Sequence, residues 1–280
     1  MEGLIIKNIS NDYVVKSGER TYVCKARGKF RSMKVVPLVG DYVSFDAENK
    51  YLLEIKPRKN YLIRPSVANV DQAIIVSSVK QPDLDTNLLD KLLTIISFHN
   101  IEPIICFTKL DLLNSYEKKT IDDYIQYYRK IGYTVVTNEK RKNLTSLFHN
   151  KITVLTGQSG AGKSSLLNLL EPTLDLKTNQ ISFALNRGKH TTRHTELYDI
   201  LDGFVVDTPG FSQVDFHEMT KMDIRDNMKE MFEHLDDCKY RDCMHIKEDG
   251  CKIKEMVLEK EILSSRYDHY KYFIESKNQD

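Results

Sequence analysis

Residues 157–164 read Gly-Gln-Ser-Gly-Ala-Gly-Lys-Ser and fill every fixed position of the phosphate-binding loop pattern. The pattern lies between an apolar stretch, residues 152–156, and a helix expected over Ser165–Leu170, which is the context that it requires. Glycines here let backbone N–H groups point at phosphate oxygens, and the helix N-terminus adds a positive field. We therefore expect the phosphates of a nucleotide to be bound by Gly157, Gln158, Ser159, Gly160, Ala161, Gly162, Lys163, Ser164 and Ser165.

Two side chains of this loop and one later carboxylate supply the groups that phosphoryl transfer needs. Lys163 is expected to reach the β- and γ-phosphates as a catalytic residue, and Ser164 to ligate Mg²⁺. Asp207-Thr208-Pro209-Gly210 follows an apolar strand, and α/β sheets bind their ligands at the carboxyl ends of strands. We expect Asp207 to hold the magnesium shell and the backbone N–H of Gly210 to contact the γ-phosphate.

Residues 188–195 read Gly-Lys-His-Thr-Thr-Arg-His-Thr and follow a stretch without firm periodicity. We interpret them as a loop in which a threonine hydroxyl completes the magnesium shell when the γ-phosphate is present. Thr191 and Thr192 are both candidates, and the sequence does not choose between them. The alternative is an ordinary polar surface loop.

Thr108-Lys109-Leu110-Asp111 follows the strand expected over residues 103–107 and resembles the Asn/Thr-Lys-x-Asp motif of GTPases. A carboxylate at Asp111 can accept from both the ring N–H and the exocyclic amine of guanine, whereas adenine has no matching pair of donors. Lys109 can lay its apolar stem along the base, and Thr108 completes the motif. The sequence therefore predicts guanine specificity, which a small-molecule kinase with the same phosphate loop would not need.

The order of these motifs is unusual, because the guanine motif precedes the phosphate loop instead of following it. The same sheet with the chain termini moved to a different loop explains this order, so we expect a circularly permuted nucleotide domain. The Ser-Ala pair that usually braces guanine should follow the strand at 133–137. The chain has Thr137-Asn138-Glu139-Lys140 there, and we assign no residue of this segment to the site.

The position after Gly210, where many GTPases carry a glutamine that orients the attacking water, holds Phe211. A phenyl ring cannot hold water in line, so we expect slow intrinsic hydrolysis and stimulation by a partner. His190 is the candidate catalytic group in the chain. The alternative is a nucleotide-regulated RNA-binding scaffold with negligible hydrolysis.

Near the C-terminus, Cys238, Cys243, His245 and Cys251 offer three thiolates and one imidazole within fourteen residues. This is the ligand set of a closed tetrahedral zinc site, so we expect one structural Zn²⁺. The alternative is a group of unrelated free cysteines. Cys24 and Cys106 stand alone among apolar residues and are expected to be buried.

Three domains are expected to carry these motifs: a β-barrel of the oligonucleotide-binding type over 1–66, a circularly permuted GTPase domain over 67–217, and a zinc-binding helical domain over 218–280. Short strands broken by turn residues predict the barrel. Residues 1–66 hold thirteen Lys/Arg against seven Asp/Glu. Lys25, Arg27, Lys29, Arg31 and Lys34 are clustered with Phe30, a combination that suits an RNA backbone; the alternative is a solvated basic hairpin.

Strands and helices alternate over 67–217, which is typical of a doubly wound α/β sheet. The chain has 280 residues, of which 41% are hydrophobic and 29% charged, as in ordinary globular proteins. No apolar stretch approaches the roughly 18 residues that span a bilayer. We therefore expect a soluble, cytoplasmic protein without a membrane partner.

The barrel, the permuted order of Thr108–Asp111, Gly157–Ser164 and Asp207–Gly210, and the cysteine cluster together resemble the ribosome small-subunit-dependent GTPase A (RsgA) family. The resemblance covers nearly the whole chain. It implies a GTP hydrolase with GTP/GDP and Mg²⁺ as ligands, which acts late in the maturation of the 30S ribosomal subunit and is stimulated by it. It also implies contact with 16S rRNA and a monomeric protein.

Overall fold

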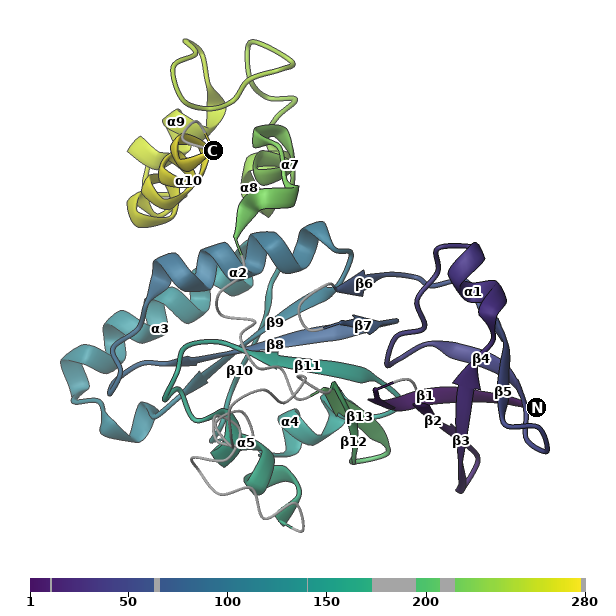
Figure 1. Ribbon diagram of the computed structural model, residues 1–280. Coiled ribbons are helices and arrows are strands. Elements are labelled where there is room, and N and C mark those ends of the chain that lie inside the picture. The colour runs from purple at the N-terminus through teal and green to yellow at the C-terminus, as the bar shows by residue number, and fades with distance from the viewer. Residues whose placement is uncertain (11, 63–65, 140, 173–194, 207–214, 278–280) are drawn as a thin grey trace. The chain divides into compact units, whose positions relative to one another are not determined.

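The computed structural model describes residues 1–280 apart from 11, 63–65, 140, 173–194, 207–214 and 278–280 (Figure 1). Contacts divide the chain into two compact units. The first holds Met1–Ala73, Lys140–Thr156 and Lys163–Phe211; the second holds Ile74–Glu139, Gly157–Gly162 and Ser212–Asp280. The glycine-rich part of the phosphate loop thus belongs to the same unit as the guanine motif.

The first unit begins with a closed barrel whose strands lie in the order β1-β2-β3-β5-β4. These strands are β1 (Glu2–Ile9), β2 (Asp12–Ser17), β3 (Arg20–Ala26), β4 (Tyr42–Asp46) and β5 (Tyr51–Ile55). Their inward side chains are fully buried, among them Ile5, Val15, Cys24, Phe45 and Leu52. The expected barrel is confirmed.

The basic segment of the barrel does not form a hairpin. After β3 the chain turns into the short helix α1 (Gly28–Ser32), and Phe30 is buried while the side chains of Lys25, Arg27 and Lys29 are exposed. The guanidinium of Arg27 lies 5.7 Å from the centroid of the Tyr51 ring, on the neighbouring strand β5. Cationic and aromatic groups therefore share one exposed area of the barrel.

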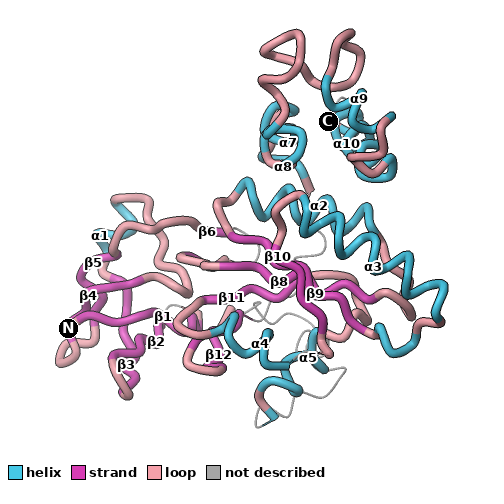
Figure 2. Tube along the Cα trace, turned by 180° about the vertical axis from the view of Figure 1, so that it is seen from behind, coloured by secondary structure: helices cyan, strands magenta, loops and turns pink. Residues whose placement is uncertain are grey.

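The first unit also contains strands that flank the phosphate loop in sequence. In it, β11 (Ile152–Thr156) pairs in parallel with β13 (Gly203–Val206), and β12 (Leu197–Ile200) pairs antiparallel with β13. Helices α4 (Arg141–Phe148) and α5 (Lys163–Leu170) contact each other (Figure 2). A short pair, β6 (Tyr61–Leu62) and β7 (Val67–Ala68), completes the described strands of this unit.

The second unit contains three strands in the order β10-β9-β8. They are β8 (Gln72–Ser78), whose first two residues belong to the first unit, β9 (Glu102–Thr108) and β10 (Thr134–Thr137). All seven residues of β8 are buried, as expected for a parallel sheet covered on both faces. The α/β pattern predicted from the sequence is confirmed here.

Helices α2 (Thr86–Phe98) and α3 (Ser115–Lys130) pack against this sheet and have well-defined N-termini (Figure 1). The Asp85 carboxylate accepts from the backbone N–H of Leu88 at 2.9 Å and caps α2. Asn114 and Glu117 form a capping box at α3. These caps satisfy N–H groups that have no partner inside the helix. Apolar periodicity predicts a helix over residues 121–131, and the observed helix α3 begins earlier, at Ser115.

The C-terminal part of the second unit is helical, with η4 (Phe216–Glu218), α7 (Lys221–Asp226), α8 (Lys229–Glu233), α9 (Lys252–Leu258) and α10 (Ser264–Ser276). Its core joins residues of these helices to Ile95 of α2 and to Cys243 and Cys251 of the cysteine cluster. Among the described residues, no helix is long and apolar enough to cross a membrane.

A buried network of charges connects α10 with α2 and α8. The Arg266 guanidinium, 1% exposed, donates to the Asp90 and Glu230 carboxylates, each at 2.6 Å. The Tyr128 hydroxyl also donates to Asp90 at 2.6 Å, and a His269 ring nitrogen lies 2.6 Å from the other Asp90 oxygen. Since buried charges are costly without partners, the complete pairing fixes how these helices pack.

Candidate functional site

The guanine motif lies where strand β9 ends. Thr108 is the last residue of β9, and Asp111 lies in the 3₁₀ turn η1 (Leu110–Leu112) with an exposed side chain. Between them Lys109 has a left-handed backbone with φ of 62°. Few residues other than glycine adopt this conformation, and they often do so at functional sites. The turn leaves the Asp111 carboxylate free to accept hydrogen bonds from a base.

Two hydrogen bonds attach the guanine motif to the phosphate loop. The buried hydroxyl of Thr108 donates to the carbonyl of Ala161 at 2.7 Å. The Lys109 ammonium donates to the carbonyl of Gly160 at 2.9 Å and also to the carbonyl of Gln81. The structure therefore brings together two sequence motifs that lie 53 and 51 residues apart at these contacts.

The backbone of the phosphate loop requires glycine at its first position. Gly157 has φ of 121°, and a Cβ atom added to it would lie 2.1 Å from the Val76 carbonyl oxygen of β8. Gly162 has φ of 95°, also in the region that favours glycine. The loop thus passes against β8 at a distance that no side chain permits. This agrees with the reason for which the sequence pattern needs glycines.

The sequence did not reveal a further contact to the loop, made by Gln81 and Pro82. A Cβ added to Gly160 would lie 3.5 Å from Pro82 Cδ, and the Gln81 carbonyl accepts from Lys109. Lys80 next to them pairs with Glu117 at 2.8 Å, and this hydrogen bond lowers the pKa of the Glu117 carboxyl. The segment after β8 therefore supports both motifs. Its contacts use a carbonyl and a ring, which leave no recognisable sequence pattern.

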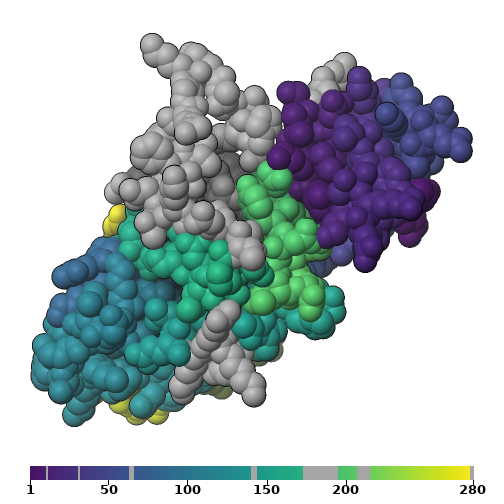
Figure 3. Space-filling model, turned by 90° about the horizontal axis from the view of Figure 1, so that it is seen from below, coloured from purple at the N-terminus to yellow at the C-terminus, as the bar shows by residue number. Residues whose placement is uncertain are grey.

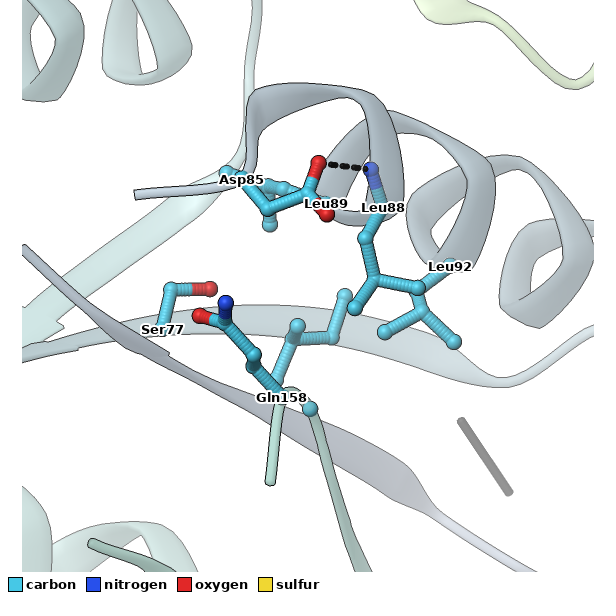
Figure 4. A pocket seen from close by; sticks show the side chains of 8 residues that line it. Ser77, Asp85, Leu88, Leu89, Leu92 and Gln158 are labelled. Carbon is cyan, nitrogen blue, oxygen red and sulfur yellow. Dashed lines mark hydrogen bonds between the residues drawn. The ribbon is translucent and has the colours of Figure 1, made fainter. Parts of the chain in front are cut away.

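A small pocket lies behind the phosphate loop, between β8 and α2 (Figure 4). It has room of about 10 Å³, which suits one water molecule and not a nucleotide. Figure 4 shows the Gln158 side chain pointing toward Ser77 and α2. Gln158 can therefore contribute its backbone to a phosphate site, while its amide faces α2. The pocket is lined by Ile75, Ser77, Asp85, Leu88, Leu89, Leu92, Gly157 and Gln158.

The side chains expected at the phosphates begin helix α5, directly after Gly162. Lys163 is the first residue of α5, and burial lowers the pKa of its ammonium group. Ser164 is 8% exposed and Ser165 follows it. A lysine held in a partly desolvated position gains more from an anionic partner than a solvated one. His190, Thr191, Thr192, Asp207, Gly210 and Phe211 lie outside the described residues.

The structure also brings the four candidate zinc ligands together. Ligand atoms of Cys238, Cys243, His245 and Cys251 all lie within 4.8 Å of one another. His245 Nδ1 lies 3.6 Å from Cys238 Sγ and 3.4 Å from Cys251 Sγ. Tetrahedral zinc with its usual bond lengths places N and S ligands about 3.5 Å apart. The donor set and its spacing therefore fit zinc.

Neighbouring groups orient these ligands. The other ring nitrogen of His245, Nε2, lies 3.1 Å from the Met231 carbonyl, so Nδ1 faces the thiols. The backbone N–H of Lys252 donates to Cys238 Sγ at 3.4 Å. Metal-binding histidines commonly have a second partner of this kind on the other ring nitrogen, as His245 has in the Met231 carbonyl. Burial raises the pKa of Cys243 to about 12, so its thiol would keep its proton unless a cation displaced it.

Two family models match this chain. The model described as the RsgA GTPase matches residues 55–217, and the model described as the RsgA N-terminal domain matches residues 2–52. The chain belongs to the RsgA GTPase family. The first model covers the guanine motif, the phosphate loop and Asp207–Gly210, and the second covers most of the barrel.

Relatives of the RsgA family match along almost the whole chain. A "Small ribosomal subunit biogenesis GTPase RsgA 2" from Oceanobacillus iheyensis is 49% identical, covering 98% of this chain and 96% of the relative. A "Small ribosomal subunit biogenesis GTPase RsgA" from Bacillus cytotoxicus is 47% identical with the same coverage.

Solved structures agree with this family assignment. The crystal structure of YloQ, described as a circularly permuted GTPase, matches with a TM-score of 0.85 and 40% identity over 100% of this chain and 96% of that one. YjeQ from Thermotoga maritima matches with a TM-score of 0.84 and 32% identity, covering 98% and 97%. This chain is thus a GTP-hydrolysing enzyme with a circularly permuted fold, as its motif order predicts.

Proposed function

We propose that this RsgA-family GTPase binds the small (30S) ribosomal subunit in the cytoplasm and hydrolyses GTP to GDP and phosphate during late maturation of that subunit. The relatives named for small-subunit biogenesis motivate the partner. The observation that carries the nucleotide chemistry is the pair of hydrogen bonds from Thr108 and Lys109 to the phosphate loop. They hold the base motif and the loop at one site, as a single bound GTP requires.

We assign roles to the site residues as follows. Asp111 reads the guanine edge, and Lys109 covers the base. The loop N–H groups of residues 157–162 bind phosphate oxygens, and Lys163 neutralises the β- and γ-phosphates. Ser164, Asp207 and either Thr191 or Thr192 would hold Mg²⁺, which would offset phosphate charge when bound.

We assign domains 1–66, 67–217 and 218–280 to the barrel, the GTPase domain and the zinc-binding helical part. Zinc at the cysteine cluster would be structural, because four protein ligands leave no open position. It would organise a segment, residues 236–250, that is too polar to fold by apolar burial. A chelator should lower the unfolding temperature of the protein, and added zinc should restore it; no change would contradict the zinc assignment.

The barrel would contact 16S rRNA through Lys25, Arg27 and Lys29, with Tyr51 as a stacking surface, and the protein would act as a monomer. These three cations are exposed, and Arg27 and Tyr51 lie side by side. Positive groups beside an exposed ring suit an RNA backbone and an unstacked base.

The deciding experiment measures GTP hydrolysis across a titration of purified small subunits. We expect slow intrinsic hydrolysis, because Phe211 replaces a water-orienting glutamine, and an increase that saturates with subunits. Equal rates with and without subunits would favour the alternative, a nucleotide-regulated RNA-binding scaffold.

Two variants test the roles of single residues. Asp111→Asn should shift the preference from guanine to xanthine nucleotides, because the amide matches the changed donor pattern of xanthine. A small-molecule kinase would show no such shift. His190→Ala should reduce subunit-stimulated turnover, and unchanged turnover would remove His190 from the mechanism.

A further inference from the structure

The barrel is attached to the β12–β13 hairpin by two lysines of its wall. Lys7 of β1 pairs with the Glu196 carboxylate at 2.7 Å, and the two residues also form an antiparallel bridge. Lys16 of β2 pairs with Asp199, and its ammonium lies 5.1 Å from the centroid of the Phe204 ring. We call these five residues the barrel clamp. Figure 3 shows the hairpin, in green, directly against the purple barrel.

The pairing of the strands makes the clamp a coherent unit. Lys7 lies opposite Val14, two residues before Lys16, so both lysines lie on the same face of the barrel wall. On the hairpin, Asp199 and Phe204 are direct cross-strand partners. The register of β1 shifts between Ile5 and Lys7, which marks a bulge next to the bridge. Bulges commonly redirect a side chain at the edge of a barrel.

The hairpin connects directly to the residues that the proposed function places at the γ-phosphate. Glu196 follows the segment 188–195, which contains Thr191 and Thr192, and Val206 at the end of β13 precedes Asp207. A force on this hairpin therefore acts on the two segments next to it in sequence, and these segments carry the proposed magnesium ligands. In the described residues, the barrel contacts the hairpin through the clamp and through neighbouring residues of β1 and β12.

We propose that the barrel clamp regulates GTP hydrolysis: RNA phosphates bound at the barrel compete for Lys7 and Lys16, release Glu196 and Asp199, and free the hairpin for faster turnover. This inference rests on the proposed function. Both ion pairs are partly exposed, and such pairs are weak enough to exchange partners without unfolding. RNA phosphates can pair with Lys7 and Lys16 only when Glu196 and Asp199 have left them. RNA therefore binds the open clamp more tightly than the closed one, as a switch requires.

The test uses the full chain with GTP, with and without saturating small subunits. Glu196→Gln combined with Asp199→Asn opens the clamp but leaves every barrel cation in place. We expect intrinsic turnover to rise about three- to tenfold, as two weak ion pairs permit, and the ratio of stimulated to intrinsic turnover to fall by the same factor. Glu54→Gln is the matched control, because Glu54 pairs with Lys56 on the outer surface of the barrel and away from the hairpin's ion pairs, and it should leave both rates unchanged.

A charge swap provides the second variant. Lys7→Glu with Glu196→Lys, combined with Lys16→Glu and Asp199→Lys, keeps both pairs but removes the cations for which RNA competes. Intrinsic turnover should remain at the wild-type value while stimulation is lost. If subunits stimulate the wild type and both clamp variants by the same ratio, the clamp proposal is wrong and the proposed function stands. If subunits do not stimulate the wild type, both fall.

Discussion

At the scale of single residues, the Thr108 hydroxyl is the buried group that joins the base motif to the phosphate loop. Its hydrogen bond to Ala161 spans 2.7 Å, and Thr108→Val removes it without changing side-chain shape. One such bond contributes about 1 kcal/mol, so GTP and GDP affinity should fall roughly fivefold. Titration calorimetry with GDP measures this.

Thr94→Val is the matched control for this change. Thr94 is equally buried, and its hydroxyl donates to the Asp90 carbonyl at 2.9 Å within α2. Both variants should lose similar stability, but only Thr108→Val should lose nucleotide affinity. Equal GDP affinity in the two variants would show that Thr108 serves packing alone.

Residue patterns predict site residues only where the type of residue is constrained, by a side chain or by the backbone freedom of glycine. Thr108, Lys109 and the loop glycines stand in fixed spacings, because a base and three phosphates impose them. The supporting contact of Gln81 uses a carbonyl, which every residue possesses, so no sequence pattern marks it. The cysteine cluster was recognisable because zinc accepts few ligand types.

At the scale of secondary-structure elements, Arg266 of α10 is the countercharge for two buried carboxylates on α2 and α8. Arg266→Met would take the guanidinium away from the Asp90 and Glu230 carboxylates, and breaking a buried ion pair from one side costs about 3–5 kcal/mol of unfolding free energy. Denaturant unfolding measures this loss. Adding Asp90→Asn and Glu230→Gln should restore part of it, because no uncompensated charge remains. A milder loss in the triple variant is therefore expected; an equal loss would mean that packing, not charge, decides.

His99, the residue after α2, is expected to make the stability of the folded protein depend on pH. Burial lowers the pKa of His99, and the nearby Glu218 carboxylate opposes this shift. The unfolded chain, with a pKa of about 6.5, then binds protons more readily than the folded one. Stability is fully present above about pH 6.5 and declines as the pH falls through this value toward the lower folded pKa.

His99→Gln should make the unfolding free energy less dependent on pH below about 6.5, since the unfolded chain protonates this histidine there more readily than the folded one. Denaturant unfolding at several pH values tests this. Identical slopes in the wild type and the His99 variant would exclude His99 as the source of the pH dependence.

Elements were predictable where periodicity or turn residues were strong. Apolar periodicity predicts a helix over residues 87–99, close to the observed α2, and an apolar run predicts the strand at 152–156 as observed. Helix α4 and strand β12 were not predicted. Strand β12 has four residues, of which the two in the middle are exposed. Buried and exposed side chains therefore do not alternate along it, and its sequence lacks the usual strand pattern. The early start of α3 was encoded instead by its capping box, Asn114 and Glu117.

At the scale of the whole molecule, charge is distributed unevenly, and this distribution predicts how salt affects binding. Residues 1–66 hold thirteen Lys/Arg and seven Asp/Glu in a chain whose net charge is +1. If the barrel is the RNA-binding part, neutralising its exposed cations should weaken binding to small subunits chiefly at low salt, because fewer counterions are then released from RNA.

The triple change Lys25→Gln, Arg27→Gln and Lys29→Gln should reduce the slope of log affinity against log salt by about 2 to 3, near one unit for each phosphate contact. Small-subunit binding measured at several salt concentrations gives this slope. Lys118→Gln, Lys119→Gln and Lys130→Gln remove three exposed charges from α3 and provide the matched control, with the wild-type slope expected. Should the α3 variant lose the slope and the barrel variant keep it, RNA contact would belong to the GTPase domain, and the regulatory role of the barrel clamp would lose its basis.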